Sequence, residues 1–119
     1  MSGYSRWTRK HGLIGVVPPA DVLENILTLR IHIDRADATN GALKVRPGSH
    51  RNGILRSPVS DLPEEECVME AGDVMLMSPL LLHASMRSTT DAPRRVLHVE
   101  VTDHALDGVL KWSECWPVE

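Results

Sequence analysis

Two short stretches of the chain alternate apolar and polar residues, and this alternation constrains the fold more than any other feature. They are LTLRIHI (27–33) and RRVLHVEV (94–101). A period of two is typical of a β-strand, in which successive side chains point to opposite faces. Each stretch is therefore expected to have one aliphatic face and one mixed face. The mixed faces comprise Thr28, Arg30 and His32 on the first stretch, and Val96, His98 and Glu100 on the second.

Further short apolar runs, separated by glycine and proline, extend this pattern along the chain. Strands are expected at 12–17, 42–46, 66–70, 74–78 and 80–86, with a short helix within 19–27 and a solvated end at SRWTRK (5–10). Many short strands with little helix indicate an all-β sandwich or barrel. The length of 119 residues suits a single domain spanning 1–119.

The mixed faces allow two interpretations. In an ordinary sandwich, the face that carries charged groups lies in water. In a small barrel, the same face lines a polar pocket, and the aliphatic face packs against an outer layer. Composition does not choose between these two arrangements.

Bulk composition excludes several classes of partner. A net charge of −3 without a block of Lys and Arg argues against a nucleic-acid or anionic-membrane partner. The apolar runs are too short to span a membrane, and residues 1–12 lack the apolar core of a secretory signal. Two cysteines do not make a disulfide framework. We therefore expect a cytoplasmic protein.

An ordered set of motifs then narrows the fold and the function. An Asn-Gly turn is followed by PGSH (47–50), AGD (71–73), a His after an apolar run at LLLHAS (80–85), and an Arg eleven residues later. Over about residues 12–112, the chain resembles the phytanoyl-CoA dioxygenase family. The resemblance implies a double-stranded β-helix, which is a cupin-like jelly roll. It also implies an Fe(II)- and 2-oxoglutarate-dependent hydroxylase of a small organic substrate.

The resemblance assigns roles to individual residues. His83 matches a metal-binding His of the family, and Arg94 matches the Arg that pairs with the far carboxylate of 2-oxoglutarate. It also makes the two mixed strands neighbours, so we expect their mixed faces to line one cavity, with Arg30 near Glu100. The residues expected to line that pocket are Arg30, His32, His98 and Glu100.

The family's His-x-Asp ligand pair has no match upstream of the matching region, since His11 is followed by Gly12 and Leu13. The chain is therefore expected to correspond to the C-terminal part of the family domain, with the jelly roll truncated on its N-terminal side. His32 and Asp34 in RIHID (30–34) have the spacing to replace the missing pair. Against this, the resemblance aligns them with a later strand, and Asp34 enters a loop, where Asp often shapes a turn.

Three functions remain open at this point. The first is a dioxygenase with an incomplete metal triad. The second is a non-catalytic barrel that binds a small ligand or acts only through assembly. The third is a cupin-like protein that uses His32, His83 and His98 for another metal.

A homo-oligomer, most simply a two-fold dimer, is the expected state of assembly. The stretch from 74 to 84 carries no charge, and a jelly roll without its first strands has open sheet edges and an uncovered apolar face. Such edges and faces favour pairing with another chain.

Overall fold

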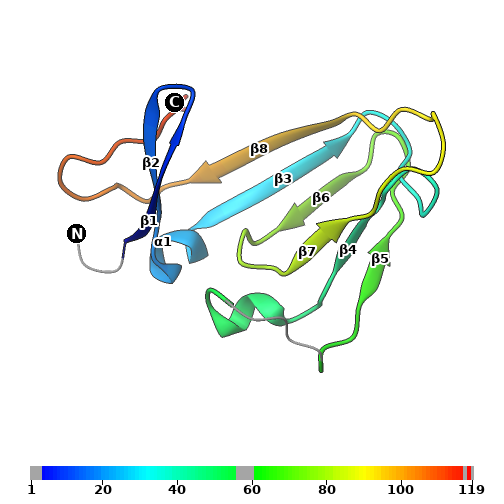
Figure 1. The fold of residues 1–119 in the computed structure, drawn as a ribbon, viewed down its shortest axis with the longest axis horizontal. Coiled ribbons are helices and arrows are strands. Elements are labelled where there is room, and N and C mark those ends of the chain that lie inside the picture. The colour runs from blue at the N-terminus through cyan, green and yellow to red at the C-terminus, as the bar shows by residue number, and fades with distance from the viewer. Residues whose placement is uncertain (1–3, 56–60, 117, 119) are drawn as a thin grey trace.

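A computed structural model describes residues 4–55, 61–116 and 118 of the chain, and its strands form three antiparallel sheets (Figure 1). One sheet is a hairpin, the second has the strand order β6-β3-β8, and the third has the order β5-β4-β7. The strands are β1 (Ser5–Lys10), β2 (Leu13–Val17), β3 (Ile26–His32), β4 (Leu43–Val45), β5 (Glu65–Cys67), β6 (Val74–Met77), β7 (His83–Ser85) and β8 (Val96–Thr102). The helical elements are α1 (Ala20–Glu24) and the 3-10 turn η1 (Ser49–Asn52). The all-β prediction is confirmed.

Three predicted elements differ from the structure. The stretch SRWTRK (5–10) forms β1 and pairs with β2, although no strand was expected there, while Trp7, Thr8 and Arg9 are exposed, as a solvated end would be. The two residues that connect β1 to β2, His11 and Gly12, each have a positive φ, as a type I′ hairpin turn requires. The helix is shorter than predicted because β3 begins at Ile26. Strand β7 covers only 83–85 because Leu80 and Leu81 lie in a turn after Pro79.

From β3 onward, the chain passes back and forth between the two three-stranded sheets. Strand β3 lies in one sheet, β4 and β5 in the other, β6 in the first, β7 in the second and β8 in the first again. Strands that are neighbours within one sheet are therefore distant in sequence, because the chain visits the other sheet between them. This connectivity fits the jelly roll of the family resemblance.

The hydrophobic core between the two three-stranded sheets is small. Leu43 and Val45 of β4 pack with Met77 of β6. Met77 lies opposite Thr28 in the ladder, so the mixed face of β3 turns toward the second sheet.

Burial confirms the inward direction of this mixed face. Thr28 and His32 are each only 2% exposed, whereas Leu27 on the other face of β3 is 43% exposed. For β3 this agrees with the interpretation that has a polar interior, whereas His98 and Glu100 on the mixed face of β8 are exposed.

The aliphatic face of the β6-β3-β8 sheet points outward and forms what we call the outer face. Its exposed members include Leu27, Val74, Leu76, Leu97 and Val101. No layer covers it within the described part of the chain, in contrast to the outer layer considered for a barrel. The radius of gyration is 16.0 Å, against about 13.5 Å for a compact domain of this length. The two sheets therefore form an open rather than a closed unit.

Candidate functional site

Pairing of β3 with β8 brings the two mixed faces together. Thr28 lies opposite Glu100, Arg30 opposite His98, and His32 opposite Val96. Residues directly opposite in an antiparallel pair share a face, so the two mixed faces adjoin, as expected. The expected shared cavity stays a prediction, because the His98 and Glu100 side chains are 48% and 55% exposed.

Glu100 contacts polar neighbours on this face, but Arg30 is not one of them. Thr28 Oγ1 donates a hydrogen bond to Glu100 Oε1 at 3.5 Å, and His98 Nε2 lies 3.5 Å from the same oxygen. Arg30 is opposite His98, one pair further along, and among the described residues it forms no ion pair with Glu100. The Glu100 carboxylate therefore does not neutralise the guanidinium of Arg30.

Buried basic groups without partners distinguish the other end of the shared face. Arg30 Nε and both ring nitrogens of His32 are buried and have no hydrogen-bond partner among the described residues. A buried polar group without a partner is costly and rare in folded proteins. This end of the face therefore has the capacity to bind a polar ligand.

Arg94 contributes positive charge to the same place. Burial lowers the pKa of His32, the charges of Arg30 and Arg94 lower it further, and Asp73 acts in the opposite direction. The pKa of Arg30 is lowered first by burial and then by Arg94. These basic side chains, from β3 and from the segment before β8, form what we call the basic cluster: Arg30, His32 and Arg94. Its charge suits an anion.

The Asn40–Gly41 turn lies against the segment that carries Arg94. Gly41 has a φ of +86°, and a Cβ added there would lie 2.4 Å from Met86 O and 3.5 Å from Arg94 Nε. Only glycine combines this backbone conformation with so close an approach. The turn therefore lies directly against the backbone at Met86 and beside the Arg94 side chain.

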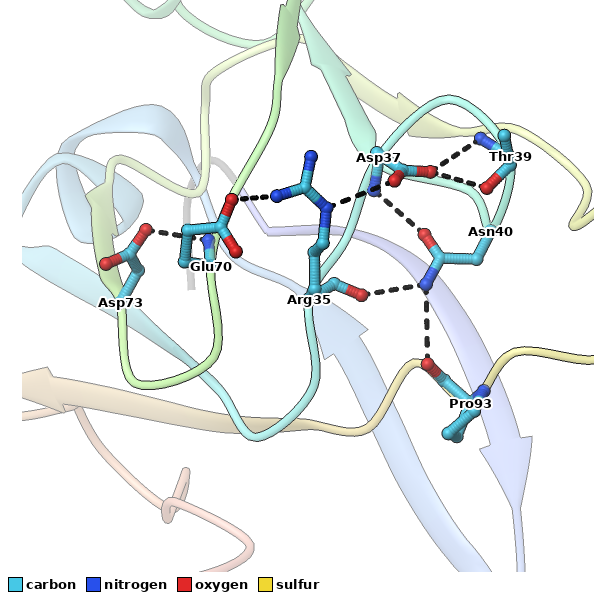
Figure 2. Close-up of polar contacts among 7 residues, drawn as sticks. All are labelled: Arg35, Asp37, Thr39, Asn40, Glu70, Asp73 and Pro93. Atoms are coloured by element: carbon cyan, nitrogen blue, oxygen red, sulfur yellow. Dashed lines mark hydrogen bonds and ion pairs between the residues drawn. The ribbon is translucent and has the colours of Figure 1, made fainter.

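The loop before this turn is braced by side chains (Figure 2). Arg35 forms ion pairs with Asp37, at 3.2 Å, and with Glu70. Asp37 Oδ1 accepts hydrogen bonds from the backbone and hydroxyl of Thr39, at 2.9 and 2.6 Å. These contacts hold the pKa of Asp37 at about 2, first through Thr39 and then through Arg35. The loop is thus tied to the turn at Glu70.

Asp34, considered above as a metal ligand, is engaged by Arg95. Asp34 Oδ2 accepts from the backbone N–H and Nε of Arg95 at 2.8 and 2.9 Å, and Oδ1 accepts from Nη2 at 2.9 Å. These hydrogen bonds lower the pKa of Asp34 to about 2. Sequence reasoning gave Arg95 no role. The sequence did carry a signal. In the alternating stretch 94–101, Arg95 is the one charged residue on the face whose other members are Leu97, Val99 and Val101.

His83 lies on the second sheet, opposite Val45. It is exposed, and its Nδ1 is 2.7 Å from Leu81 O. It also borders a largely aliphatic hollow of about 250 Å³. Over the described ranges 4–55, 61–116 and 118, the structure contains no group of three or more His, Cys, Asp or Glu that could hold a metal. The ligand roles of His83, and of His32 and Asp34, therefore stay predictions.

The structure also bears on membrane association. None of the helices in the described parts of the chain has the length and apolar character that crossing a bilayer requires.

Comparisons with known proteins agree with the sequence motifs. The family model for phytanoyl-CoA dioxygenase matches residues 5–96. A rat (Rattus norvegicus) relative, "Phytanoyl-CoA dioxygenase, peroxisomal", is 29% identical over 97 residues, which cover 66% of this chain and 28% of the relative. This chain thus spans less than a third of the length of that curated relative. No solved structure matches the chain. Because the family model covers well over half of the sequence, the chain belongs to the phytanoyl-CoA dioxygenase family.

Proposed function

We propose that this chain carries the 2-oxoglutarate-binding part of a dioxygenase that hydroxylates a small organic substrate. Arg94 is the anchor for the far carboxylate, and Arg30 and His32 complete the site. The observation that carries the proposal is the basic cluster, in which Arg30 Nε and both His32 nitrogens are buried without protein partners.

The chemistry of the cluster suits a carboxylate. The planar guanidinium of Arg94 can donate two parallel hydrogen bonds to the two oxygens of one carboxylate. The lowered pKa of His32 favours its neutral form, which donates through one ring nitrogen and accepts through the other. A bound dicarboxylate would thus neutralise the guanidinium groups and pair the buried nitrogens.

Membership in the family implies Fe(II) as well as 2-oxoglutarate, and together they would supply the oxidising chemistry for hydroxylation. The part of the chain that the structure describes does not fit Fe(II) on its own, since it brings no set of three ligands together. His83 is the one ligand that the family pattern assigns to it. The proposed role of this chain is therefore binding of the co-substrate 2-oxoglutarate.

The incomplete ligand set favours a second candidate function, a non-catalytic barrel that binds a small ligand or serves assembly. Iron-dependent release of succinate from 2-oxoglutarate distinguishes the two, because only the dioxygenase produces it. Other metal chemistry at His32, His83 and His98 receives no support, because His98 lies beside Glu100 and His83 lies on the other sheet.

Binding of 2-oxoglutarate, measured by titration calorimetry, tests the proposal. Arg94→Met should weaken binding by about tenfold to a hundredfold, as expected for the loss of a charged hydrogen bond of about 1.5–3 kcal/mol. Arg94→Lys keeps the charge but loses the planar fork, so it should restore only part of the affinity. Arg87→Met is the matched control on an exposed loop and should bind as the wild type does. No binding by the wild-type chain would refute the proposal.

We also propose that the chain works in the cytoplasm and assembles into a homodimer. The first proposal rests only on the sequence, whereas the rat relative is named as a peroxisomal protein. The second rests on the exposed outer face.

A further inference from the structure

Arg94 lies two residues before β8, so the β-ladder does not set its direction. Two residues of a distant loop hold its neighbours instead. Asn40 Nδ2 donates to Pro93 O at 3.3 Å, and Asp34 binds the backbone and side chain of Arg95. Arg94 is thus held on both sides by residues more than 50 positions away.

We propose that Asn40 is a positioning residue for Arg94. By holding the carbonyl of Pro93, it aims the Arg94 side chain over Gly41 and toward Arg30 and His32. The inference rests on the proposed function only for the identity of the anion that Arg94 binds.

The surroundings of Asn40 suit this role (Figure 2). Asn40 is only 6% exposed, and both ends of its amide are used. Nδ2 donates to Arg35 O at 2.7 Å as well as to Pro93 O, and Oδ1 accepts from Asp37 N at 2.8 Å. Two of these bonds stay within the loop, and the third links it to the segment before Arg94. Asn40 therefore fixes the position of Pro93 relative to the loop.

The segment that it holds has few other constraints. Proline has no N–H, so Pro93 O is the only backbone hydrogen-bonding group of that residue. Residues 87–93 are exposed. Further back, the chain is held where Thr89 N donates to Thr39 O at 2.8 Å. Without the amide of Asn40, the stretch between Thr89 and Arg95 would lose the hydrogen bond that ties Pro93 to the loop at Asn40.

Two substitutions test the inference. Asn40→Asp keeps the size and the acceptor oxygen but removes both donors, and Asn40→Ala removes the amide without adding charge. Both should raise the dissociation constant of 2-oxoglutarate by on the order of tenfold, in calorimetry on the full chain. Asn25→Asp is the matched control. Asn25 is exposed, donates to Asp21 O at 2.7 Å, and undergoes the same charge change far from Arg94 in sequence. It should bind as the wild type does.

Amide hydrogen exchange gives a readout that does not depend on 2-oxoglutarate. The Arg95 amide donates to Asp34 at 2.8 Å, and it should exchange severalfold faster in both Asn40 variants. Amides in the middle of β8 should keep their wild-type rates, whereas a general loss of stability would raise all of them.

The outcomes separate two claims, that the chain binds 2-oxoglutarate and that Asn40 positions Arg94. Wild-type affinity for 2-oxoglutarate in both Asn40 variants would overturn the inference. If the wild-type chain does not bind 2-oxoglutarate, the proposed function fails, and exchange at Arg95 alone decides the positioning role, with an unchanged rate overturning it. If Asn40→Asp does not fold, Asn40→Ala decides in its place.

Discussion

Replacing Gly41 with alanine tests the close approach of the Asn40–Gly41 turn to the backbone at Met86. Gly41 has a φ of +86°, and its added Cβ would lie 2.4 Å from the carbonyl oxygen of Met86. Because that neighbour is backbone, it has no rotamer through which to withdraw. The substitution should therefore push the Asn40–Gly41 turn away from the segment at Met86.

The expected magnitude has two parts. A left-handed conformation costs a residue with a Cβ roughly 1–2 kcal/mol. Forcing extra volume into a packed site typically costs about 1–3 kcal/mol more. Gly41→Ala should thus lower the free energy of unfolding by about 2–5 kcal/mol, a large share of the 5–15 kcal/mol that is usual for a domain.

Gly48→Ala is the matched control for the conformational part. Gly48 has a φ of +82°, and an added Cβ there would meet nothing within 4 Å. It should therefore cost only about 1–2 kcal/mol. Urea denaturation of both variants, followed by circular dichroism, measures the difference. An equal loss of stability in the two variants would refute the close approach.

Three further predictions follow from burial, charge and exposure. His32→Asn should flatten the pH dependence of stability below about pH 6.5. With its pKa lowered by folding, His32 is protonated more readily in the unfolded chain, so the wild type loses stability as the pH falls; an unchanged slope in urea denaturation would contradict this. Asp34→Asn should destabilise the chain above about pH 4, and its difference from the wild type should shrink as the pH falls toward the folded pKa of about 2. A difference that persists below pH 2 would have another cause. Leu76→Glu, at an outer-face position that is 60% exposed, should dissociate the proposed homodimer in light scattering, whereas Val109→Glu, at an 84% exposed position outside the sheets, should not. A wild-type mass of 13.2 kDa would refute the dimer.

Local patterns in the sequence were sufficient to predict the strands that carry the site. Alternation over 27–33 and 94–101 predicted β3 and β8, because the pleat places every second side chain on one face. The ordered motifs from Asn40 to Arg94 indicated the family. Both signals are readable without the fold, since each depends on residues that are near in sequence or on their order along the chain.

Strand β1 shows where the local signal ends. Its sequence, SRWTRK, has no apolar face, and it forms a strand because β2 pairs with it across the turn at His11 and Gly12. A strand that gains its order from a neighbour's backbone does not require alternation in its own sequence.

Only the tertiary structure decided which face of β3 lies inside. Alternation shows that two faces differ, but the inner face depends on which sheet packs against it. Here that sheet buries Thr28 and His32 and leaves the aliphatic face outward, opposite to the usual arrangement. The contacts that hold Arg94 were equally absent from the sequence signal. Asn40 meets Pro93 across 53 positions, and Asp34 meets Arg95 across 61. Such pairs form only when the sheet registers bring distant loops together, and no short-range pattern encodes that distance.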